Sequence, residues 1–247
     1  MKKLLEGKRV LVTGGSRGLG RAFCEAFAAE GADVALSYTR DEASAAQTVE
    51  AIKASGRRGR AFCTSVLDVE ATRAMIKAME DDWGGVDVLV NNAGITQNLP
   101  LALLEEEDWD RVMDVNVKGT YLTSRAALRG MVRRKSGVIL NIGSLAGARM
   151  LDAPIHYCAS KAAIKGLTEA LAKEVARHRI RVVCLAPGLL EDGLGRNLPP
   201  HRLDAYLHHC ALGRVGRFDE VARFAAFLIS DANAFMTGET VIMDGGV

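Results

Sequence analysis

Apolar and polar residues along the chain follow two alternating patterns. Short runs that are apolar throughout, such as residues 10–12, predict strands that are buried on both faces. Longer segments in which apolar residues recur every three or four positions predict helices that bury one face. The predicted strands cover residues 10–13, 33–38, 60–64, 86–90, 137–142, 181–185 and 240–243. The predicted helices cover residues 21–30, 42–54, 71–83, 109–131, 157–172, 203–210 and 219–229.

Strands and helices alternate along the chain. This order predicts an α/β fold, with a Rossmann-type doubly wound parallel sheet and helices on both of its faces. No linker, low-complexity segment or clear repeat interrupts the order, so we expect residues 1–247 to form a single domain. A polar stretch at residues 189–201, which contains Gly and Pro, predicts a mobile loop.

Composition and charge narrow the class of protein. The 247 residues are 49% hydrophobic and 25% charged, which is typical of a globular protein with a sizeable core. The formal net charge of +2 does not favour nucleic-acid or membrane binding, and we expect neither. The apolar run at residues 10–12 is too short for a signal peptide or a membrane span. The 5 cysteines are odd in number and lack a CxxC pair, so we expect free thiols, no metal site and a cytoplasmic location.

A glycine-rich loop lies between the first predicted strand and the first predicted helix. Its residues, GGSRGLG at 14–20, allow a tight turn and a close approach of the backbone to a phosphate. The helix that follows offers N–H donors and the positive end of its dipole. A plain turn between a strand and a helix is the alternative. The candidate phosphate-binding residues are Gly14, Ser16, Arg17, Gly18, Leu19 and Gly20.

Tyr157 and Lys161 are four residues apart in a segment that is rich in Ala and Leu. On a helix, this spacing puts both side chains on one face, about one turn apart. A free phenol has a pKa of about 10, and an ammonium beside it favours the phenolate. The pair can therefore form a general acid–base that is tuned toward neutral pH. A solvated surface helix can show the same spacing, so the pair needs support from the rest of the chain.

Glycine and polar residues also follow other predicted strands. NNAG follows the strand at 86–90, Ser144 comes soon after the strand at 137–142, and Pro187 and Gly188 follow the strand at 181–185. Ligands of open parallel sheets bind at the carboxyl ends of the strands. We therefore expect one site that joins these residues to the glycine loop.

Taken together, the motifs resemble those of the short-chain dehydrogenase/reductase family over essentially the whole chain. The matching segments are TGGSRGLG at 13–20, NNAG at 91–94, Asn116 within VNVKG, Ser144 thirteen residues before Tyr157, YCASK at 157–161 and PG at 187–188. The resemblance implies a catalytic tetrad. Tyr157 would exchange a proton with the substrate oxygen, and Ser144 would hydrogen-bond that oxygen. Lys161 would hold the nicotinamide ribose and lower the pKa of Tyr157, while Asn116 would hold a water that links Lys161 to solvent.

The resemblance also implies further contacts with a nicotinamide dinucleotide. Ser65 and Val66 occupy the positions beside the adenine, although the family often has Asp where this chain has Ser65. A Thr that usually follows the Pro-Gly pair and touches the nicotinamide is replaced here by Asp192, so we expect this loop to take another course or to lose that contact. The remaining expected contacts are Asn92, Ala93, Gly94, Tyr157, Lys161, Pro187 and Gly188.

The choice between NAD and NADP depends on the end of the second predicted strand. An NAD site usually has an acid there, which hydrogen-bonds the ribose 2′-hydroxyl. Here the strand is followed by Thr39 and Arg40, and the first acid is Asp41. Because guanidinium groups suit bidentate phosphate contacts, Arg17 and Arg40 predict a clamp for the 2′-phosphate of NADP(H). The alternative is that Arg40 is merely solvated.

Within the family, the segment at residues 213–246 is most similar to beta-ketoacyl carrier-protein reductases. This resemblance implies reduction of a 3-oxoacyl thioester, of fatty acid or polyketide type, and a homotetramer. An acidic carrier protein would dock on basic surface. The candidate patches are Arg133, Arg134 and Lys135, and Arg177, His178, Arg179 and Arg181, although solvated helix ends have the same composition.

Two other functions stay open at this level. The chain could oxidise a small alcohol, a sugar or a steroid with the same tetrad. It could also be a non-catalytic dinucleotide-binding sensor or assembly subunit, a possibility that the tetrad argues against and Asp192 leaves open.

Overall fold

The computed structural model describes residues 3–192 and 200–247. Within them, a seven-stranded sheet has the order β3-β2-β1-β4-β5-β6-β7, and neighbouring strands pair in parallel. The strands are β1 (Arg9–Val12), β2 (Asp33–Tyr38), β3 (Gly59–Cys63), β4 (Val88–Asn91), β5 (Gly137–Ile142), β6 (Ile180–Pro187) and β7 (Thr240–Met243). The helices are α1 (Gly18–Ala29), α2 (Glu42–Ala54), α3 (Val69–Trp83), α4 (Glu106–Met113), α5 (Gly119–Arg134), α6 (Ile155–Val175), α7 (Pro200–His209) and α8 (Phe218–Ile229).

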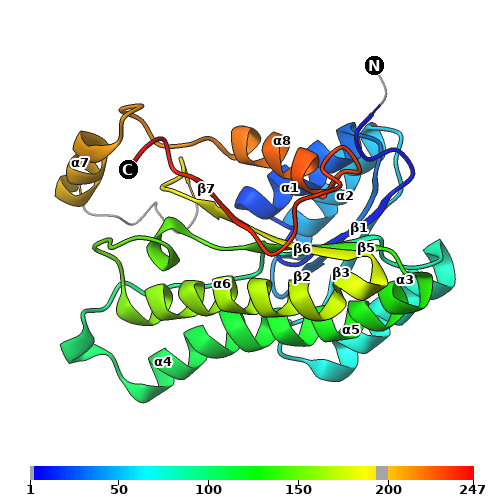
Figure 1. Ribbon diagram of the computed structural model, residues 1–247, viewed down its shortest axis with the longest axis horizontal. Helices are drawn as coiled ribbons and strands as arrows, with labels where there is room; N and C mark the ends of the chain where they lie inside the picture. The colour runs from blue at the N-terminus through cyan, green and yellow to red at the C-terminus, as the bar shows by residue number, and fades with distance from the viewer. Residues whose placement is uncertain (1–2, 193–199) are drawn as a thin grey trace.

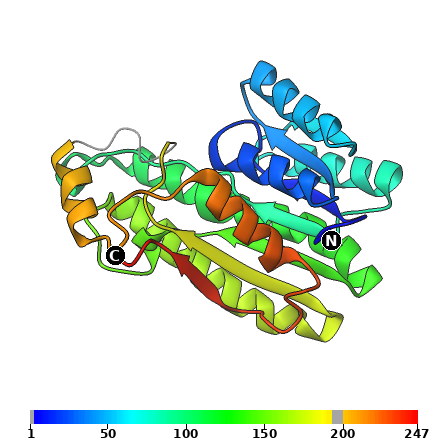
Figure 2. The same cartoon turned by 90° about the horizontal axis from the view of Figure 1, so that it is seen from above.

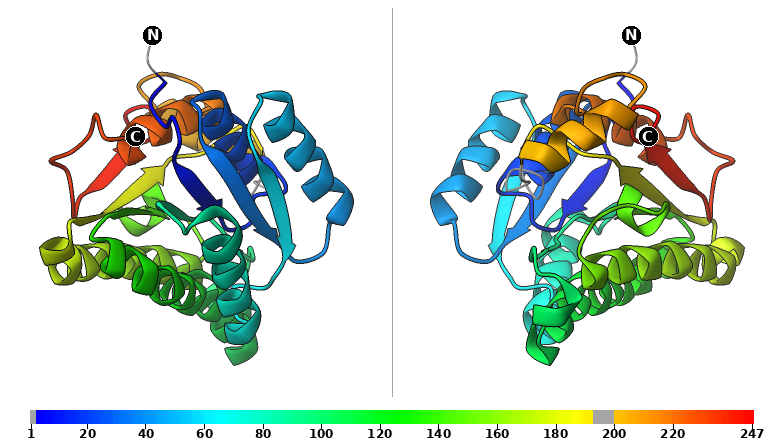
Figure 3. Two further views of the ribbon diagram at one scale, coloured as in Figure 1. Left: turned by 90° about the vertical axis from the view of Figure 1, so that its right-hand side faces the viewer. Right: turned by 90° about the vertical axis from the view of Figure 1, so that its left-hand side faces the viewer.

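Helices cover both faces of the sheet. Helices α1, α2 and α8 lie on one face, and α3, α4, α5 and α6 lie on the other (Figures 1 and 3). Successive residues of a strand point to opposite faces, so Val10 and Val12 pack with the α1 and α8 layer while Leu11 packs with Met131 of α5. This arrangement explains why the strands are apolar at every position, and it confirms the predicted α/β fold.

The order of the strands reverses beside β1. The chain runs outward from β1 to β2 and β3, then returns to place β4 on the other side of β1. At such a switch point the connections after β1 and β4 leave in opposite directions, which opens a crevice at the carboxyl edge of the sheet. The glycine loop follows β1 and the NNAG segment follows β4, so both lie at this switch point.

The predicted helix at residues 109–131 is not regular. It is divided into α4, a π-helical turn η2 (Asp114–Lys118) and α5. A π turn holds one residue more than an α turn, and hydrophobic spacing alone does not reveal it. The prediction of one continuous helix was therefore wrong in this segment.

The other elements agree with the sequence to within a few residues. The helix at 42–54 and the strand at 137–142 are found with the predicted bounds. Most of the predicted mobile loop, residues 193–199, lies outside the described residues, and α7 begins at its far end. None of the helices that the structure describes is long and apolar enough to cross a bilayer.

Candidate active site

The glycine loop is shaped by residues that tolerate no side chain. Gly14 and Gly18 have φ angles of +65° and +54°, in the left-handed region that favours glycine. A Cβ on Gly20 would lie 2.2 Å from the Gly14 carbonyl oxygen and 2.6 Å from Asn92 Nδ2. The backbone of the loop is therefore closely folded on itself, with no room for a side chain at Gly20.

The loop ends at the N-terminus of α1. Arg17 is the N-cap residue, and its side chain makes no capping hydrogen bond. Leu19 points to the core, whereas Arg21 Nε donates to the Ser16 carbonyl at 3.2 Å and fixes the loop from behind. The first N–H groups of α1 are thus left without a side-chain cap, as an anion site at a helix N-terminus requires.

Asn92 ties the end of β4 to the glycine loop. Its Nδ2 donates to the carbonyls of Thr13 and Gly14 at 2.9 and 3.1 Å. In return, Thr13 Oγ1 accepts from the backbone N–H groups of Asn92 and Ala93, both at 3.0 Å. Thr13 opens the TGGSRGLG motif but is not among the predicted site residues. A hydroxyl that acts only through contacts with distant backbone groups has no sequence signal of its own.

Arg17 and Arg40 are both exposed, and the charge of Arg17 acts on Asp41, the neighbour of Arg40. Asp41 is the N-cap of α2, and its carboxylate accepts from the Ser44 N–H at 2.9 Å. That hydrogen bond, with the charges of Arg17 and Arg21, lowers the pKa of Asp41. The acid is therefore engaged in capping a helix, which leaves this corner of the site basic.

Ser65 and Val66 follow β3 in a tight turn. The Ser65 hydroxyl accepts from the Leu67 N–H at 3.3 Å, so the side chain stabilises its own turn. Val66 is buried and packs against Gly119, where a Cβ would lie 2.5 Å from a Val66 methyl group. The place of the adenine contacts stays a prediction.

Ser144, Tyr157 and Lys161 are brought together where β5 ends and α6 begins. Ser144 caps the short turn η3 (Leu145–Gly147), where its Oγ accepts from the Ala146 N–H at 3.2 Å, and its hydroxyl acts on the Tyr157 phenol in the direction that lowers the pKa of that phenol. Lys161 Nζ donates to the Ile142 carbonyl at 2.8 Å and lies 5.7 Å from the centre of the Tyr157 ring. The three predicted residues therefore form one cluster at the carboxyl end of the sheet.

The protonation of this pair differs from the expectation. Burial raises the pKa of Tyr157 above its ordinary value, and the opposing effect of the Ser144 hydroxyl offsets only part of this increase. Burial also lowers the pKa of Lys161 to about 8. The Lys161 ammonium bonds a backbone carbonyl and lies at the level of the Tyr157 ring. Burial of the phenol outweighs the effect of this charge, so the pKa of Tyr157 is not lowered as the spacing suggested.

Asn116, in the π turn η2, uses its whole amide group inside the protein. Its Oδ1 accepts from the Ile95 N–H at 2.8 Å, and its Nδ2 donates to the Ile95 carbonyl and to Ser160 Oγ, both at 2.9 Å. A Cβ on Gly94 would lie 3.3 Å from Asn116 Oδ1 and 3.7 Å from Lys161 Nζ. Asn116 thus holds the backbone of Ile95, directly after the NNAG segment, beside Lys161. Its expected role in holding a water stays a prediction.

A buried polar network lies beneath these residues. Asn91 Nδ2 donates to Asn141 Oδ1 at 2.8 Å and to Ser124 Oγ at 2.9 Å. Asn141 Nδ2 in turn donates to Thr168 Oγ1 on α6 at 2.9 Å. The network fixes β4, β5, α5 and α6 relative to one another, which sets the distance between the Tyr157 helix and the NNAG segment. Asn141, Ser124 and Thr168 have no signal of their own in the sequence, because each is an ordinary polar residue whose partners lie far away along the chain.

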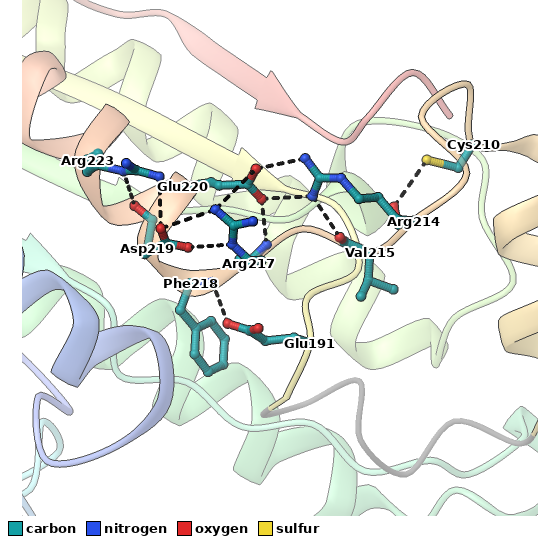
Figure 4. A network of polar contacts seen from close by, with 9 residues as sticks. All are labelled: Glu191, Cys210, Arg214, Val215, Arg217, Phe218, Asp219, Glu220 and Arg223. Atoms are coloured by element: carbon teal, nitrogen blue, oxygen red, sulfur yellow. Dashed lines mark hydrogen bonds and ion pairs between the residues drawn. The ribbon is translucent and has the colours of Figure 1, made fainter.

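Pro187 ends β6, and Gly188 donates its N–H to the Met243 carbonyl at 3.0 Å. The segment then turns toward α8 (Figure 4), where Glu191 Oε1 accepts from the Phe218 N–H at 2.9 Å. In the same first turn of α8, the Arg214 guanidinium lowers the pKa of Glu220 to about 2. Glu191 is therefore turned toward the N-terminus of a helix, so its charge is not directed at a cofactor phosphate.

Comparison with known proteins agrees with this site. A family model described as short chain dehydrogenase matches residues 8–202. The chain belongs to the short-chain dehydrogenase family. Among curated relatives of this short-chain dehydrogenase is the 3-oxoacyl-(acyl-carrier-protein) reductase FabG of Vibrio cholerae, 39% identical over 243 residues and covering 98% of both chains.

Solved structures give the same result. A short chain dehydrogenase from Burkholderia cenocepacia in complex with NADP is 36% identical, with a TM-score of 0.91 and coverage of 98% of both chains. A gluconate 5-dehydrogenase from the same organism, in complex with NADP and tartrate, is 33% identical, with a TM-score of 0.93 and coverage of 99% of this chain and 96% of that one. The family resemblance read from the motifs is confirmed.

The residues of this short-chain dehydrogenase fit a nicotinamide dinucleotide. The glycine loop has no room for a Cβ at Gly20, the first turn of α1 lacks a side-chain cap, and Lys161 lies beside Gly94. The first two features suit a pyrophosphate, and the third puts a hydrogen-bond donor where the NNAG segment and the Tyr157 helix meet.

Proposed function

We propose that this short-chain dehydrogenase reduces a ketone to a secondary alcohol with NADPH, and that its substrate is a 3-oxoacyl thioester on an acyl carrier protein, of fatty acid or polyketide type. The observation that carries the proposal is the cluster of Ser144, Tyr157 and Lys161 at the carboxyl edge of the sheet. The full-length similarity to the Vibrio cholerae reductase supports the carrier-bound substrate.

Each residue of the cluster has a defined task in this reaction. Reduction builds negative charge on the ketone oxygen, and a donor placed there in advance lowers the barrier. The bound cofactor supplies the hydride. Tyr157 Oη gives its proton to the oxygen, and Ser144 Oγ donates a second hydrogen bond to it. Because the pKa of Lys161 is about 8, its side chain is mostly an ammonium at neutral pH, and its charge favours the phenolate that Tyr157 becomes.

The neutral state of Tyr157 before reaction suits an acid. Burial raises the pKa of the phenol, so it keeps its proton at neutral pH until the ketone oxygen accepts it. Asn116 fixes the backbone of Ile95, and this contact holds the NNAG segment in place beside Lys161.

NADPH is the proposed cofactor because the corner at the end of β2 is basic. Arg17 and Arg40 are exposed there, while Asp41 caps α2. A 2′-phosphate would gain two charge-assisted contacts, each stronger than a neutral hydrogen bond. The ratio of kcat/KM for NADPH to that for NADH tests this assignment. We expect Arg40→Ala to lower the ratio about tenfold or more, and a wild-type preference for NADH would overturn it.

The carrier protein would dock on the basic patches, but within one chain these lie far from the cluster. Lys135 and Arg179 adjoin the amino ends of β5 and β6, whereas Ser144 follows the carboxyl end of β5. Strand β5 has 6 residues, which span about 20 Å. Arg134 and Arg181 are also used internally, since both donate to backbone carbonyls. The exposed cations that remain for docking are Lys135, Arg177, Arg179 and Arg133, the last of which is paired with Glu80.

A homotetramer reconciles the patches with the site. Helices α5 and α6 run along one face of the molecule (Figure 1), and α6, with 21 residues, is about 30 Å long. Tyr157 is near its first residue and Arg179 follows its last turn. An antiparallel two-fold pairing of this helical layer would put the patch of one copy beside the cluster of the next. A chain that is monomeric by light scattering would overturn this arrangement.

Docking is tested with Lys135→Glu combined with Arg179→Glu. We expect KM to rise for an acyl group on its carrier protein and to stay unchanged for the same acyl group on a small thioester, because only the carrier needs the patch. Arg73→Glu, at an exposed position of α3, is the matched control. Equal kinetics of the double variant with both substrates would contradict the docking.

The reaction itself is tested with Tyr157→Phe and a panel of 3-oxoacyl thioesters, simple ketones and oxidised sugar acids. Turnover should fall by about 10²-fold or more while NADPH still binds, because the variant lacks only the proton donor. Full activity in this variant would refute the role of Tyr157. Preference for a sugar acid would favour the second candidate, a sugar-acid dehydrogenase, which the similarity to the gluconate 5-dehydrogenase supports.

We also place the protein in the cytoplasm. The 5 cysteines are all free thiols, which suits a reducing compartment.

A further inference from the structure

The segment that follows β6 is packed too tightly to move alone. A Cβ on Gly188 would lie 2.4 Å from the hydroxyl oxygen of Tyr206 and 2.9 Å from Asp244 Cα. This segment leaves the carboxyl edge of the sheet next to β5, which leads to Ser144. The position of Gly188 and Leu189 is therefore part of the geometry of the site.

Tyr206, on α7, holds this segment through its hydroxyl group. The hydroxyl accepts from the Leu189 N–H at 2.9 Å and donates to the Asp244 carbonyl at 3.3 Å. Asp244 follows β7, so one hydroxyl links α7, the chain after β6 and the chain after β7. In Figure 2, α7 lies at the same end of the molecule as the C-terminus, which agrees with these contacts.

The other end of the same segment is fixed on α8. Glu191 N–H donates to the Gly216 carbonyl at 3.0 Å, and Gly216 N–H donates back to the Leu189 carbonyl at 2.9 Å. The Glu191 carboxylate accepts from the Phe218 N–H, as Figure 4 shows. The Phe218 ring lies beside the glycine loop, 3.8 Å from where a Cβ on Gly18 would be. Residues 188–191 are thus connected to the expected pyrophosphate site.

We infer that Tyr206 is a positioning residue for the nicotinamide half of the cofactor. Its hydroxyl sets the backbone at Gly188 and Leu189, while Glu191 sets the far end of the segment against the glycine loop. This inference rests on the proposed function, since it assumes that a dinucleotide binds between these two loops. Tyr206 acts through the backbone and does not itself touch the reacting atoms.

The chain offers a matched series of hydroxyl deletions as the test: Tyr206→Phe, Tyr157→Phe and Tyr121→Phe. Each removes one oxygen, and Tyr121 is an exposed residue of α5. The dissociation constant for NADPH, measured by fluorescence on the full chain, should rise about threefold to tenfold in Tyr206→Phe, as expected for the loss of one neutral hydrogen bond. It should stay unchanged in Tyr121→Phe, whereas Tyr157→Phe, at an expected cofactor contact, should lose turnover.

Two readouts separate positioning from a merely structural role. In Tyr206→Phe the dissociation constant should rise while the pH profile of kcat, which reports Tyr157, stays in place. A lower melting temperature with unchanged NADPH affinity would overturn the inference. Wild-type protein that does not bind NADPH at all would instead overturn the proposed function, so the two failures are distinguishable.

A second measurement needs no variant and covers the case in which Tyr206→Phe does not fold. Hydrogen exchange of the Leu189 amide in the wild-type chain reports its bond to Tyr206. Protection that deepens when NADPH is added supports the inference. Exchange that is unaffected by NADPH overturns it, whether or not the amide is protected beforehand.

Discussion

The burial of the Lys161 ammonium is unfavourable, and Lys161→Met should therefore stabilise the protein. The side chain is 7% exposed, and burial lowers its pKa from the ordinary 10.5 to about 8. This difference corresponds to about 3 kcal/mol of destabilisation while the lysine is charged in both states. Removal of the hydrogen bond to the Ile142 carbonyl costs about 1 kcal/mol. We expect a net gain of about 2 kcal/mol at pH 7.

The gain should depend on pH in a defined direction. Below pH 8 the lysine is charged whether the chain is folded or unfolded, so the wild type bears the full penalty. Between pH 8 and 10.5 the folded protein loses the proton before the unfolded chain does, so the penalty fades and the advantage of the variant shrinks. At pH 7 the melting temperature of the variant should rise by about 4–8 °C.

The assay is urea unfolding of both proteins at pH 7 and pH 9.5, at one protein concentration and without cofactor. The same variant should lose turnover, because Lys161 is proposed to support the Tyr157 phenolate. A variant that is less stable than the wild type at pH 7 would refute the reasoning, since it would mean that the buried ammonium is well compensated. An advantage that does not shrink at pH 9.5 would refute the assigned cause.

Three further predictions concern buried residues, and one concerns an open glycine that serves as a contrast. Gly20→Ala should weaken NADPH binding at least tenfold, because the new Cβ would lie 2.2 Å from the Gly14 carbonyl oxygen. Gly166→Ala, with open space around the new Cβ, should instead raise the free energy of unfolding by about 0.5–1 kcal/mol. Asn141→Ala should lower the free energy of unfolding by about 3 kcal/mol in a urea titration, because it leaves buried partners unsatisfied; a loss below about 1 kcal/mol would contradict the network. Burial lowers the pKa of His156, so as the pH falls below 6.5 the unfolded chain takes up a proton more readily than the folded protein, and the wild type loses stability. His156→Leu should therefore lose less stability than the wild type between pH 8 and pH 5. Equal losses in the two proteins would disprove this.

The sheet and the position of the catalytic cluster could be predicted from local patterns. Strands that are apolar at every position indicate burial on both faces, and the rule for parallel sheets then brings Ser144 and Gly188 to one edge. The structure places them there, with Tyr157 and Lys161 at the start of α6. The resemblance to the family added the roles of the individual residues.

Other parts of the site depend on contacts between residues far apart in the chain. Asn141 reaches Asn91 and Thr168, and Tyr206 reaches Leu189 and Asp244; none of these pairs has a spacing that sequence can read. The pKa of Tyr157 was also misjudged, because the spacing indicates one helix face but not the direction in which the Lys161 ammonium points. Burial and hydrogen-bond direction are properties of the packed chain.

The π turn at Asp114–Lys118 limits how this region of the chain can vary. It contains one residue more than a regular helical turn, and each residue of a helix turns the next by about 100°. Deleting one residue here would restore a regular helix but would rotate α4 against α5 by that angle. Trp109 and Val112 would then point in a different direction from α4 relative to α5, and Asn116 would no longer face Ile95. A single-codon loss in this turn should therefore be far more damaging than most point substitutions around it.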